Sequence, residues 1–217
     1  MSHFISLEGP EGSGKTTQLR LLQAYLEGQG VPVVLTREPG GTSIGDQVRQ
    51  VLHDLRNDEM LPRTEVLLYS ASRAQLVGQV IRPALAAGAV VLCDRFSEST
   101  LAYQGYGRGL DLAGLRLLTE YATEGLRPDL VIYLDLPVTV GLGRKLLARE
   151  REQAEWTRMD QQEVEFHERV RQGYLKMAAE EPGRWCVINA QQPVAVLQAE
   201  IRKRIDALLG RGVDVRP

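Results

Sequence analysis

Eight residues near the start of the chain have the types and spacing of a phosphate-binding loop. They run Gly9-Pro-Glu-Gly-Ser-Gly-Lys15-Thr16 and follow the pattern G-x-x-x-x-G-K-[ST]. At this composition the pattern arises by chance on the order of 0.003 times, so coincidence is a poor explanation. In such a loop, backbone N–H groups converge on a phosphate, the lysine reaches the β- and γ-oxygens, and the Thr16 hydroxyl ligates Mg²⁺. The residues expected to bind ATP are Gly9, Pro10, Glu11, Gly12, Ser13, Gly14, Lys15, Thr16 and Thr17.

The loop by itself leaves several classes of protein open, among them GTPases, transporter ATPases, helicases and kinases of small molecules. The chain has no N-K-x-D motif, which argues against a GTPase, and no L-S-G-G-Q motif, which argues against a transporter ATPase. Helicases are usually longer and more basic. A kinase of a small substrate remains, with a nucleotide-dependent switch that binds ATP without turnover as a second alternative.

The elements that must position this loop are short apolar runs alternating with helical patterns. The strands expected are 4–7, 31–36, 89–93, 130–134 and 186–188. The helices expected are 16–27, 44–55, 62–87, 112–124, 138–150, 159–180 and 194–209. Continuous apolar strands separated by helices are typical of a parallel sheet buried on both faces. The chain is therefore predicted to be α/β, with a three-layer P-loop kinase fold: a five-stranded parallel sheet with helices on both faces.

Length and composition favour one domain over residues 1–217, with a polar lid segment at about 143–158. The chain has 26 basic and 28 acidic residues, and its net charge of −2 gives no global attraction to nucleic acid or to an anionic membrane. Cys93 and Cys186 lie in apolar strand-like runs, so buried free thiols are expected. No apolar run is long enough to span a bilayer, and residues 1–9 lack the features of a signal peptide, which favours a cytoplasmic protein.

Beyond the loop, the sequence resembles bacterial thymidylate kinases through nearly the whole chain. The segments that carry the resemblance are LEGPEGSGKTT (7–17), TREPGGT (36–42), LLYSASRAQL (67–76), DRFSESTLAYQG (94–105), RPDLVIYLD (127–135) and RMDQQEVEFHERVRQGY (158–174). The resemblance implies transfer of a phosphoryl group from ATP to thymidine 5′-monophosphate (dTMP), giving dTDP and ADP, with Mg²⁺. It also implies a homodimer. Another P-loop kinase of a small metabolite is the nearer alternative, and the D-R-x-x-x-S-x-x-A-Y-Q pattern argues against it.

By this resemblance the phosphate-proximal roles fall on three residues. Asp94 ends a buried strand, where its carboxylate can hold Mg²⁺ through water together with Thr16. Arg95 clamps the acceptor phosphate and screens two polyanions from each other, although a surface ion pair is its simpler alternative. Arg49 is similar to a further acceptor-site arginine, with a solvated helix charge as the alternative.

The remaining acceptor residues are also implied by the resemblance. Tyr69 and Arg73 are four apart on an expected helix, so they share a face and would line the thymine site. Ser99, Thr100 and Gln104 suit the reading of base edges, with Thr100 nearest the pyrimidine N3. Tyr103 crowds the sugar C2 position, and Glu11 contacts the sugar 3′-OH. Glu38 is a further substrate-binding residue, and the Glu38–Pro39 bond can be cis.

The last expectation concerns a catalytic arginine brought by the lid. The loop carries no basic residue before Lys15, and this sequence resembles the family subtype whose arginine comes from a lid. Residues 143–158 hold Arg144, Lys145, Arg149, Arg151 and Arg158. Arg149 or Arg151 is the expected catalytic residue, alongside Lys15 and Arg95, and Arg158 is a third candidate. A solvated helix with Arg–Glu pairs is the alternative.

Overall fold

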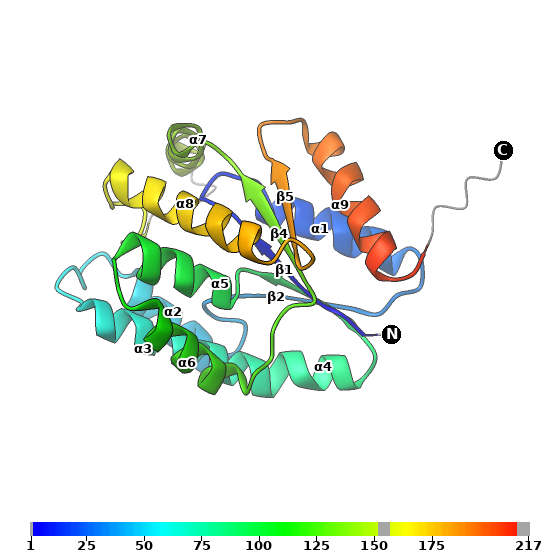
Figure 1. Ribbon diagram of the computed structural model, residues 1–217, viewed down its shortest axis with the longest axis horizontal. Coiled ribbons are helices and arrows are strands. Elements are labelled where there is room, and N and C mark those ends of the chain that lie inside the picture. Colours follow the sequence, from blue (N-terminus) through cyan, green and yellow to red (C-terminus); the bar gives the residue numbers. More distant parts are fainter. Residues whose placement is uncertain (1, 152–156, 212–217) are drawn as a thin grey trace.

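A five-stranded parallel sheet forms the centre of the computed structural model, which describes residues 2–151 and 157–211. Its strand order is β2-β3-β1-β4-β5, so the strand that feeds the phosphate loop lies in the middle. The strands are β1 Phe4–Glu8, β2 Val33–Arg37, β3 Val90–Asp94, β4 Leu130–Asp135 and β5 Trp185–Asn189. Figure 1 shows the sheet between two layers of helices. The predicted fold class is confirmed.

The helical elements follow the strands as crossover connections. The helices are α1 Lys15–Glu27, α2 Ser43–His53, α3 Pro62–Leu76, α4 Arg82–Ala86, α5 Ser97–Thr100, α6 Leu112–Thr123, α7 Val138–Glu150, α8 Val164–Glu180 and α9 Val194–Leu208. The π-helical segments of the described chain are η1 Val77–Ile81 and η2 Leu101–Gly107. Among the described residues, none of these helices combines the length and apolarity needed to cross a membrane.

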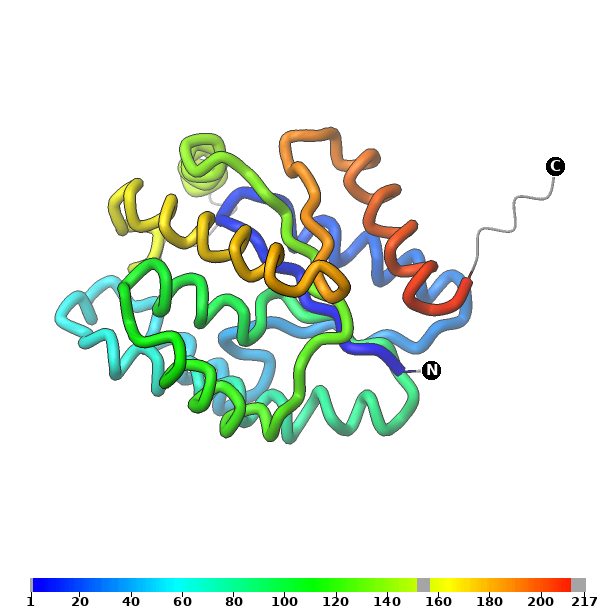
Figure 2. The backbone as a smooth tube through the Cα atoms, viewed as in Figure 1, coloured from blue at the N-terminus to red at the C-terminus, as the bar shows by residue number. Residues whose placement is uncertain are grey.

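Alternation along β1 divides the core between the two faces of the sheet. Ile5 and Leu7 pack with α1 and α9 on one face, where these two helices lie side by side (Figure 2). Phe4 packs on the other face with η1 and α4. On that same face Tyr133 of β4 packs with η2, α6 and α8. Parallel strands bring their carboxyl ends to one edge, and that edge carries the site.

The expected elements agree with the structure except in three places. The helix expected over 62–87 is α3, η1 and α4 in succession, although the chain stays helical throughout. The helix expected from 159 begins at Val164, because the Asp160 carboxylate accepts hydrogen bonds from the Thr157 backbone N–H at 2.7 Å and its hydroxyl at 2.8 Å and so forms a turn. The helical segment over α5 and η2 was not predicted, since its apolar residues follow no simple helical period. Cys93 and Cys186 are buried and free, as expected.

Candidate active site

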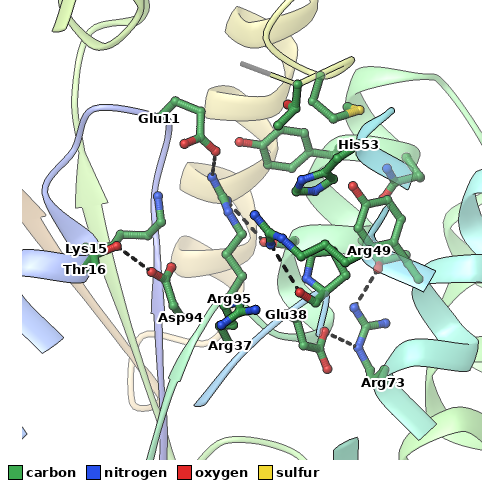
Figure 3. Close-up of a pocket in the computed structure, with 18 of the residues that line it drawn as sticks. Glu11, Lys15, Thr16, Arg37, Glu38, Arg49, His53, Arg73, Asp94 and Arg95 are labelled. Carbon is green, nitrogen blue, oxygen red and sulfur yellow. Dashed lines mark hydrogen bonds and ion pairs between the residues drawn. The ribbon is translucent and has the colours of Figure 1, made fainter. Parts of the chain in front are cut away.

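A pocket of about 280 Å³ opens where the carboxyl ends of β1, β2 and β3 meet α1, α3 and η2 (Figure 3). All ten expected acceptor residues line it, and so do Lys15, Thr16 and Asp94. The lining residues are Glu11, Lys15, Thr16, Arg37, Glu38, Pro39, Arg49, His53, Tyr69, Arg73, Asp94, Arg95, Ser99, Thr100, Tyr103, Gln104, Lys145, Thr157 and Met159. The strand ends therefore bring together side chains from distant parts of the sequence.

The phosphate loop occupies the turn from β1 to α1, with Lys15, Thr16 and Thr17 in the first turn of the helix. Gly14 lies just before the helix at φ +92°, a left-handed conformation that favours glycine. Lys15 is buried, and its Nζ donates to the carbonyls of Gly9 and Pro10, both at 3.1 Å. Burial and the nearby Arg95 lower its pKa. The loop thus holds the buried Lys15 ammonium against its own backbone, at the wall of the pocket.

Helix α7 packs directly on the backbone of this loop. A Cβ on Gly12 would lie 2.5 Å from the Gly141 carbonyl oxygen, and one on Gly141 would lie 2.6 Å from that of Glu11. Two glycines therefore let the two backbones approach. The approach also lets Arg144 donate to the Gly12 carbonyl at 3.3 Å.

Thr16, at the start of α1, contacts Asp94, at the end of β3, as a shared metal site requires. The Thr16 hydroxyl donates to Asp94 Oδ2 at 3.0 Å. A hydroxyl and a carboxylate are the hard oxygen ligands that suit Mg²⁺, which usually keeps several waters and takes its other ligands from phosphates. Within the described part of the chain, no cluster of three or more His, Cys, Asp or Glu could hold a metal. The donor set therefore fits a cation that arrives with a phosphate.

Arg95 spans the space between the phosphate loop and the rest of the pocket. Its Nη2 donates to Glu11 at 2.6 Å, and its Nη1 donates to the hydroxyls of Ser99 at 3.3 Å and Tyr174 at 3.4 Å. Its backbone is strained at φ +71°. Burial raises the pKa of Glu11, but Arg95, Lys15 and Lys145 outweigh burial and hold that pKa well below its usual range. Arg95 is thus a fixed cation facing the pocket.

Glu8 lies behind Arg95 and fixes the segment that carries it. Its carboxylate is buried and accepts hydrogen bonds from the Phe96 backbone N–H at 2.7 Å, the Ser99 hydroxyl at 2.7 Å and the Tyr174 hydroxyl at 2.8 Å. Burial raises the pKa of Glu8 to about 7, with a further contribution from Glu98, while Arg95, Ser99 and Tyr174 oppose the rise. Glu8 therefore binds its proton more tightly in the folded protein than in the unfolded chain.

Because the pKa of Glu8 differs between the folded and unfolded states, the stability of the protein should depend on pH. Replacing Glu8 with glutamine should remove this contribution to the pH dependence. A raised folded-state pKa stabilises the fold fully below the unfolded value of 4.5, and this contribution is lost as pH rises through about 7. Between pH 5 and pH 8 the free energy of unfolding of the natural protein should therefore fall relative to that of Glu8→Gln by about 2–3 kcal/mol. Urea unfolding at both pH values measures the difference. Equal pH dependence of the two proteins would contradict the prediction, and Glu120→Gln, on an exposed carboxylate of α6, is the control.

A second group of side chains lies deeper in the pocket, around Arg73. This side chain is 1% exposed; its Nε donates to Glu38 at 2.8 Å and its Nη2 to the Thr100 hydroxyl at 2.9 Å. Its Nη1 is buried and has no partner among the described residues. Burial raises the pKa of Glu38 to about 7, against the lowering effect of Arg73. The Glu38–Pro39 bond is cis, and the Tyr69 ring is half-buried at the pocket wall. The arrangement offers an unused charged donor to a ligand.

Several lining residues were not predicted. Arg37, His53, Lys145 and Met159 reach the pocket, and Glu8 and Tyr174 support it from behind. For Arg37 the sequence indicates only a position at the end of a strand. Lys145 Nζ lies 3.4 Å from both Glu11 and Asp160, so the basic side chain that α7 presents to the pocket is a lysine.

The expected lid arginines do not line this pocket. Arg151 is exposed at the end of α7, and Arg149 lies in its last turn. Arg158 is buried; it donates to Glu65 at 2.6 Å and to the Leu52 carbonyl at 3.3 Å, so it is an anchor in this conformation and not a lid arginine facing the pocket. Residues 152–156 of the expected lid lie outside the described residues.

The chain is similar to several known proteins. The family model of thymidylate kinases matches residues 7–201. The chain is 50% identical to the thymidylate kinase of Roseiflexus castenholzii, over 96% of this chain and 95% of the relative. It is 49% identical to that of Geotalea uraniireducens, over 98% and 100%. The crystal structure of thymidylate kinase from Ehrlichia chaffeensis is similar with a TM-score of 0.75 and 34% identity, covering 94% of this chain and 98% of that one.

Proposed function

This chain belongs to the thymidylate kinase family and transfers a phosphoryl group from ATP to dTMP, and we propose that the pocket around Lys15, Arg95 and Arg73 carries out this transfer. One observation supports the proposal above the others. The phosphate loop and the buried Arg73 lie in the same pocket, with the Arg95 cation between them. Nη1 of Arg73 has no hydrogen-bond partner among the described residues. The pocket therefore has a phosphate end and a base end, joined by a cation at the point of transfer.

The donor end binds ATP through the loop. The backbone N–H groups at the start of α1 and the Lys15 ammonium take the β- and γ-phosphates. We propose that Thr16 and Asp94 hold Mg²⁺, which would supply positive charge to the phosphates. Lys15 then exchanges its hydrogen bonds to the loop carbonyls for phosphate oxygens. Its charge opposes the negative charge that accumulates as the phosphoryl group moves.

The acceptor end positions dTMP. Arg95 binds the acceptor phosphate, with Arg49 on the same side of the pocket, and holds it in line with the donor. Arg73 Nη1 donates to a base carbonyl, and Thr100, Ser99 and Gln104 complete the polar edge. Tyr69 stacks on the base. Glu11 accepts from the sugar 3′-OH, and Glu38 holds the Arg73 guanidinium in place.

A nucleoside monophosphate panel tests the function. ADP release in a coupled assay with ATP should depend on the acceptor and be greatest for dTMP. ADP release that is equal with and without an acceptor would favour a nucleotide-dependent switch. A preference for an unrelated small metabolite would favour a different P-loop kinase.

Tyr103 is expected to select the sugar. Its ring is buried beside Arg95, whose guanidinium lies 5.1 Å from the ring centroid, so it occupies space next to the nucleotide. Tyr103→Ala should lower the ratio of kcat/KM for dTMP to that for the ribose analogue about tenfold, because the clash with a 2′-OH is removed. Tyr106→Ala is the matched control, since Tyr106 lies on the same segment but outside the pocket lining. An unchanged ratio in Tyr103→Ala would contradict the role.

We further propose that residues 1–217 form one domain with a lid at about 143–158, and that two copies associate. Leu67 of α3, with Leu117 and Tyr121 of α6, is exposed on helices that contact each other. Such an apolar face suits a dimer interface. Two free thiols in the core suit a reducing cytoplasm.

A further inference from the structure

A buried carboxylate outside the pocket lining, Glu65 in the first turn of α3, receives four hydrogen bonds from the described residues. Its Oε1 accepts from Gln104 Nε2 at 2.9 Å and from Arg108 Nε at 3.1 Å. Its Oε2 accepts from Arg108 Nη2 at 3.0 Å and from Arg158 Nη2 at 2.6 Å. Glu65 therefore connects α3 to Arg108, at the end of η2, and to Arg158.

These contacts determine the ionisation of Glu65. Burial raises its pKa, but the hydrogen bonds from Arg108, Gln104 and Arg158 outweigh burial and lower it. An ionised carboxylate only accepts hydrogen bonds. Whatever faces Oε1 must therefore present an N–H or O–H group.

The ionised Glu65 carboxylate determines which end of the Gln104 amide faces it. Its side chain is buried and lines the pocket. An amide has a donating and an accepting end, and Glu65 takes the donating end. The carbonyl oxygen Oε1 receives no hydrogen bond from the described residues, so it remains available to a ligand as an acceptor.

The rest of the polar edge has a matching pattern. Arg73 Nη1 is a donor without a partner among the described residues, and Thr100 Oγ1 already accepts from Arg73 Nη2. A 4-oxo pyrimidine presents a carbonyl acceptor next to a ring N–H donor at this edge, whereas a 4-amino pyrimidine presents a donor next to a bare ring nitrogen. A donor at Arg73 and an acceptor at Gln104 fit the first pattern and oppose the second.

We propose that Glu65 is a specificity-determining positioning residue: it fixes the Gln104 amide so that the Gln104 carbonyl oxygen accepts from the ring N–H of thymine and disfavours cytosine. Thr100, which the resemblance places nearest the ring nitrogen, then acts by accepting from Arg73 and holding its guanidinium. This inference rests on the proposed placement of the base beside Arg73, Thr100 and Gln104. Glu65 acts through Gln104 and contacts no substrate.

Glu65→Gln tests the proposal at one atom. Two arginine Nη2 groups meet at Oε2, whereas Oε1 faces Arg108 Nε and Gln104, so the carbonyl oxygen of the introduced amide would take the Oε2 position. Its NH₂ group would then face Arg108 Nε and Gln104, and of these two only the Gln104 amide can turn to present an acceptor. Gln104 must then turn its own carbonyl toward position 65 and its NH₂ toward the pocket. The ratio of kcat/KM for dTMP to that for dCMP should fall at least about tenfold, because a mispaired buried hydrogen bond replaces a good one. Glu65→Asp keeps an acceptor-only group and should keep most of the preference.

A matched control separates this role from a general loss of packing. Glu98 is also a buried carboxylate that accepts from an arginine, Arg184 at 2.6 Å, but it does not line the active pocket. Glu98→Gln should leave the dTMP-to-dCMP ratio unchanged. Gln104→Ala should lower the ratio, and adding Glu65→Gln to it should lower the ratio no further, since the two act as one unit.

The outcomes distinguish the role of Glu65 from the placement of the base. If Gln104→Ala lowers the ratio and a folded Glu65→Gln leaves it unchanged, the role of Glu65 is overturned while the placement of the base stands. If Gln104→Ala itself leaves the ratio unchanged, the placement fails and the inference fails with it. Should Glu65→Gln not fold, amide exchange on the natural protein decides. The Gln104 side-chain protons should exchange slowly with and without dTMP, and exchange as fast as that of exposed Gln192 would overturn the proposal.

Discussion

Replacing Lys15 with alanine should lower kcat by about 10²–10³-fold, with a smaller change in KM for ATP. The ammonium is already buried at the mouth of the phosphate loop, where it donates to the Gly9 and Pro10 carbonyls. A charge held in a water-poor site stabilises developing negative charge more strongly than it stabilises the bound ground state. The loss therefore falls mainly on the chemical step, and single-turnover kinetics with saturating ATP measures it.

The folding of Lys15→Ala must be checked, because the Lys15 ammonium also donates hydrogen bonds to carbonyl groups of the loop. The thermal unfolding curve of Lys15→Ala should be a single cooperative transition like that of the natural protein. As a control, Lys203→Ala, which replaces an exposed lysine of α9, should keep full activity. A folded Lys15→Ala protein with near-normal kcat would contradict the role of the loop.

The largest effect is expected in the proposed lid segment at about 143–158. Arg149→Ala combined with Arg151→Ala should lower kcat by about 10³–10⁵-fold with little change in ATP affinity, if one of them stabilises the transferring phosphoryl group. Neither lines the pocket in this conformation, so the prediction requires the segment to close over bound nucleotides. Single and double variants are assayed for kcat under saturating substrates.

Lys145 provides the competing outcome for the lid. Its ammonium is already at Glu11, 3.4 Å away, and reaches the pocket without any movement. A double arginine variant that keeps more than about a tenth of natural kcat would exclude both arginines. A large loss in Lys145→Ala alone would then transfer the role to this lysine.

The sequence predicts the fold well because each element has a local signal. The strands are continuous apolar runs; β1 leads into Gly9 of the phosphate loop, and β3 ends at Asp94. The proposed acceptor residues are recognisable because they fall in contiguous motifs such as 94–105. Parallel pairing then brings these strand ends together, so the pocket follows from topology once the motifs are recognised.

The unpredicted residues depend on packing between distant elements. Glu8 is a single acidic residue in an apolar strand, and its importance depends on Tyr174 of α8, far along the chain. Glu65 is one acidic residue at a helix start, where a carboxylate is common for electrostatic reasons alone. Among the basic residues of the lid region that the structure describes, only the close packing of α7 on the loop selects Lys145 for the pocket. No spacing rule contains that information.

The contact between Gly12 and Gly141 has a consequence for mutational tolerance. Alanine ordinarily favours a helix over glycine by about 1 kcal/mol. At Gly141 that preference is reversed, since a methyl group would lie 2.6 Å from the Glu11 carbonyl oxygen and push α7 off the loop. At Gly143, two residues further along the same helix, a methyl group would meet nothing within 4 Å, and the ordinary preference holds. Neighbouring glycines of one helix thus have opposite evolutionary freedom, and the constrained one is the one on which the active-site loop rests.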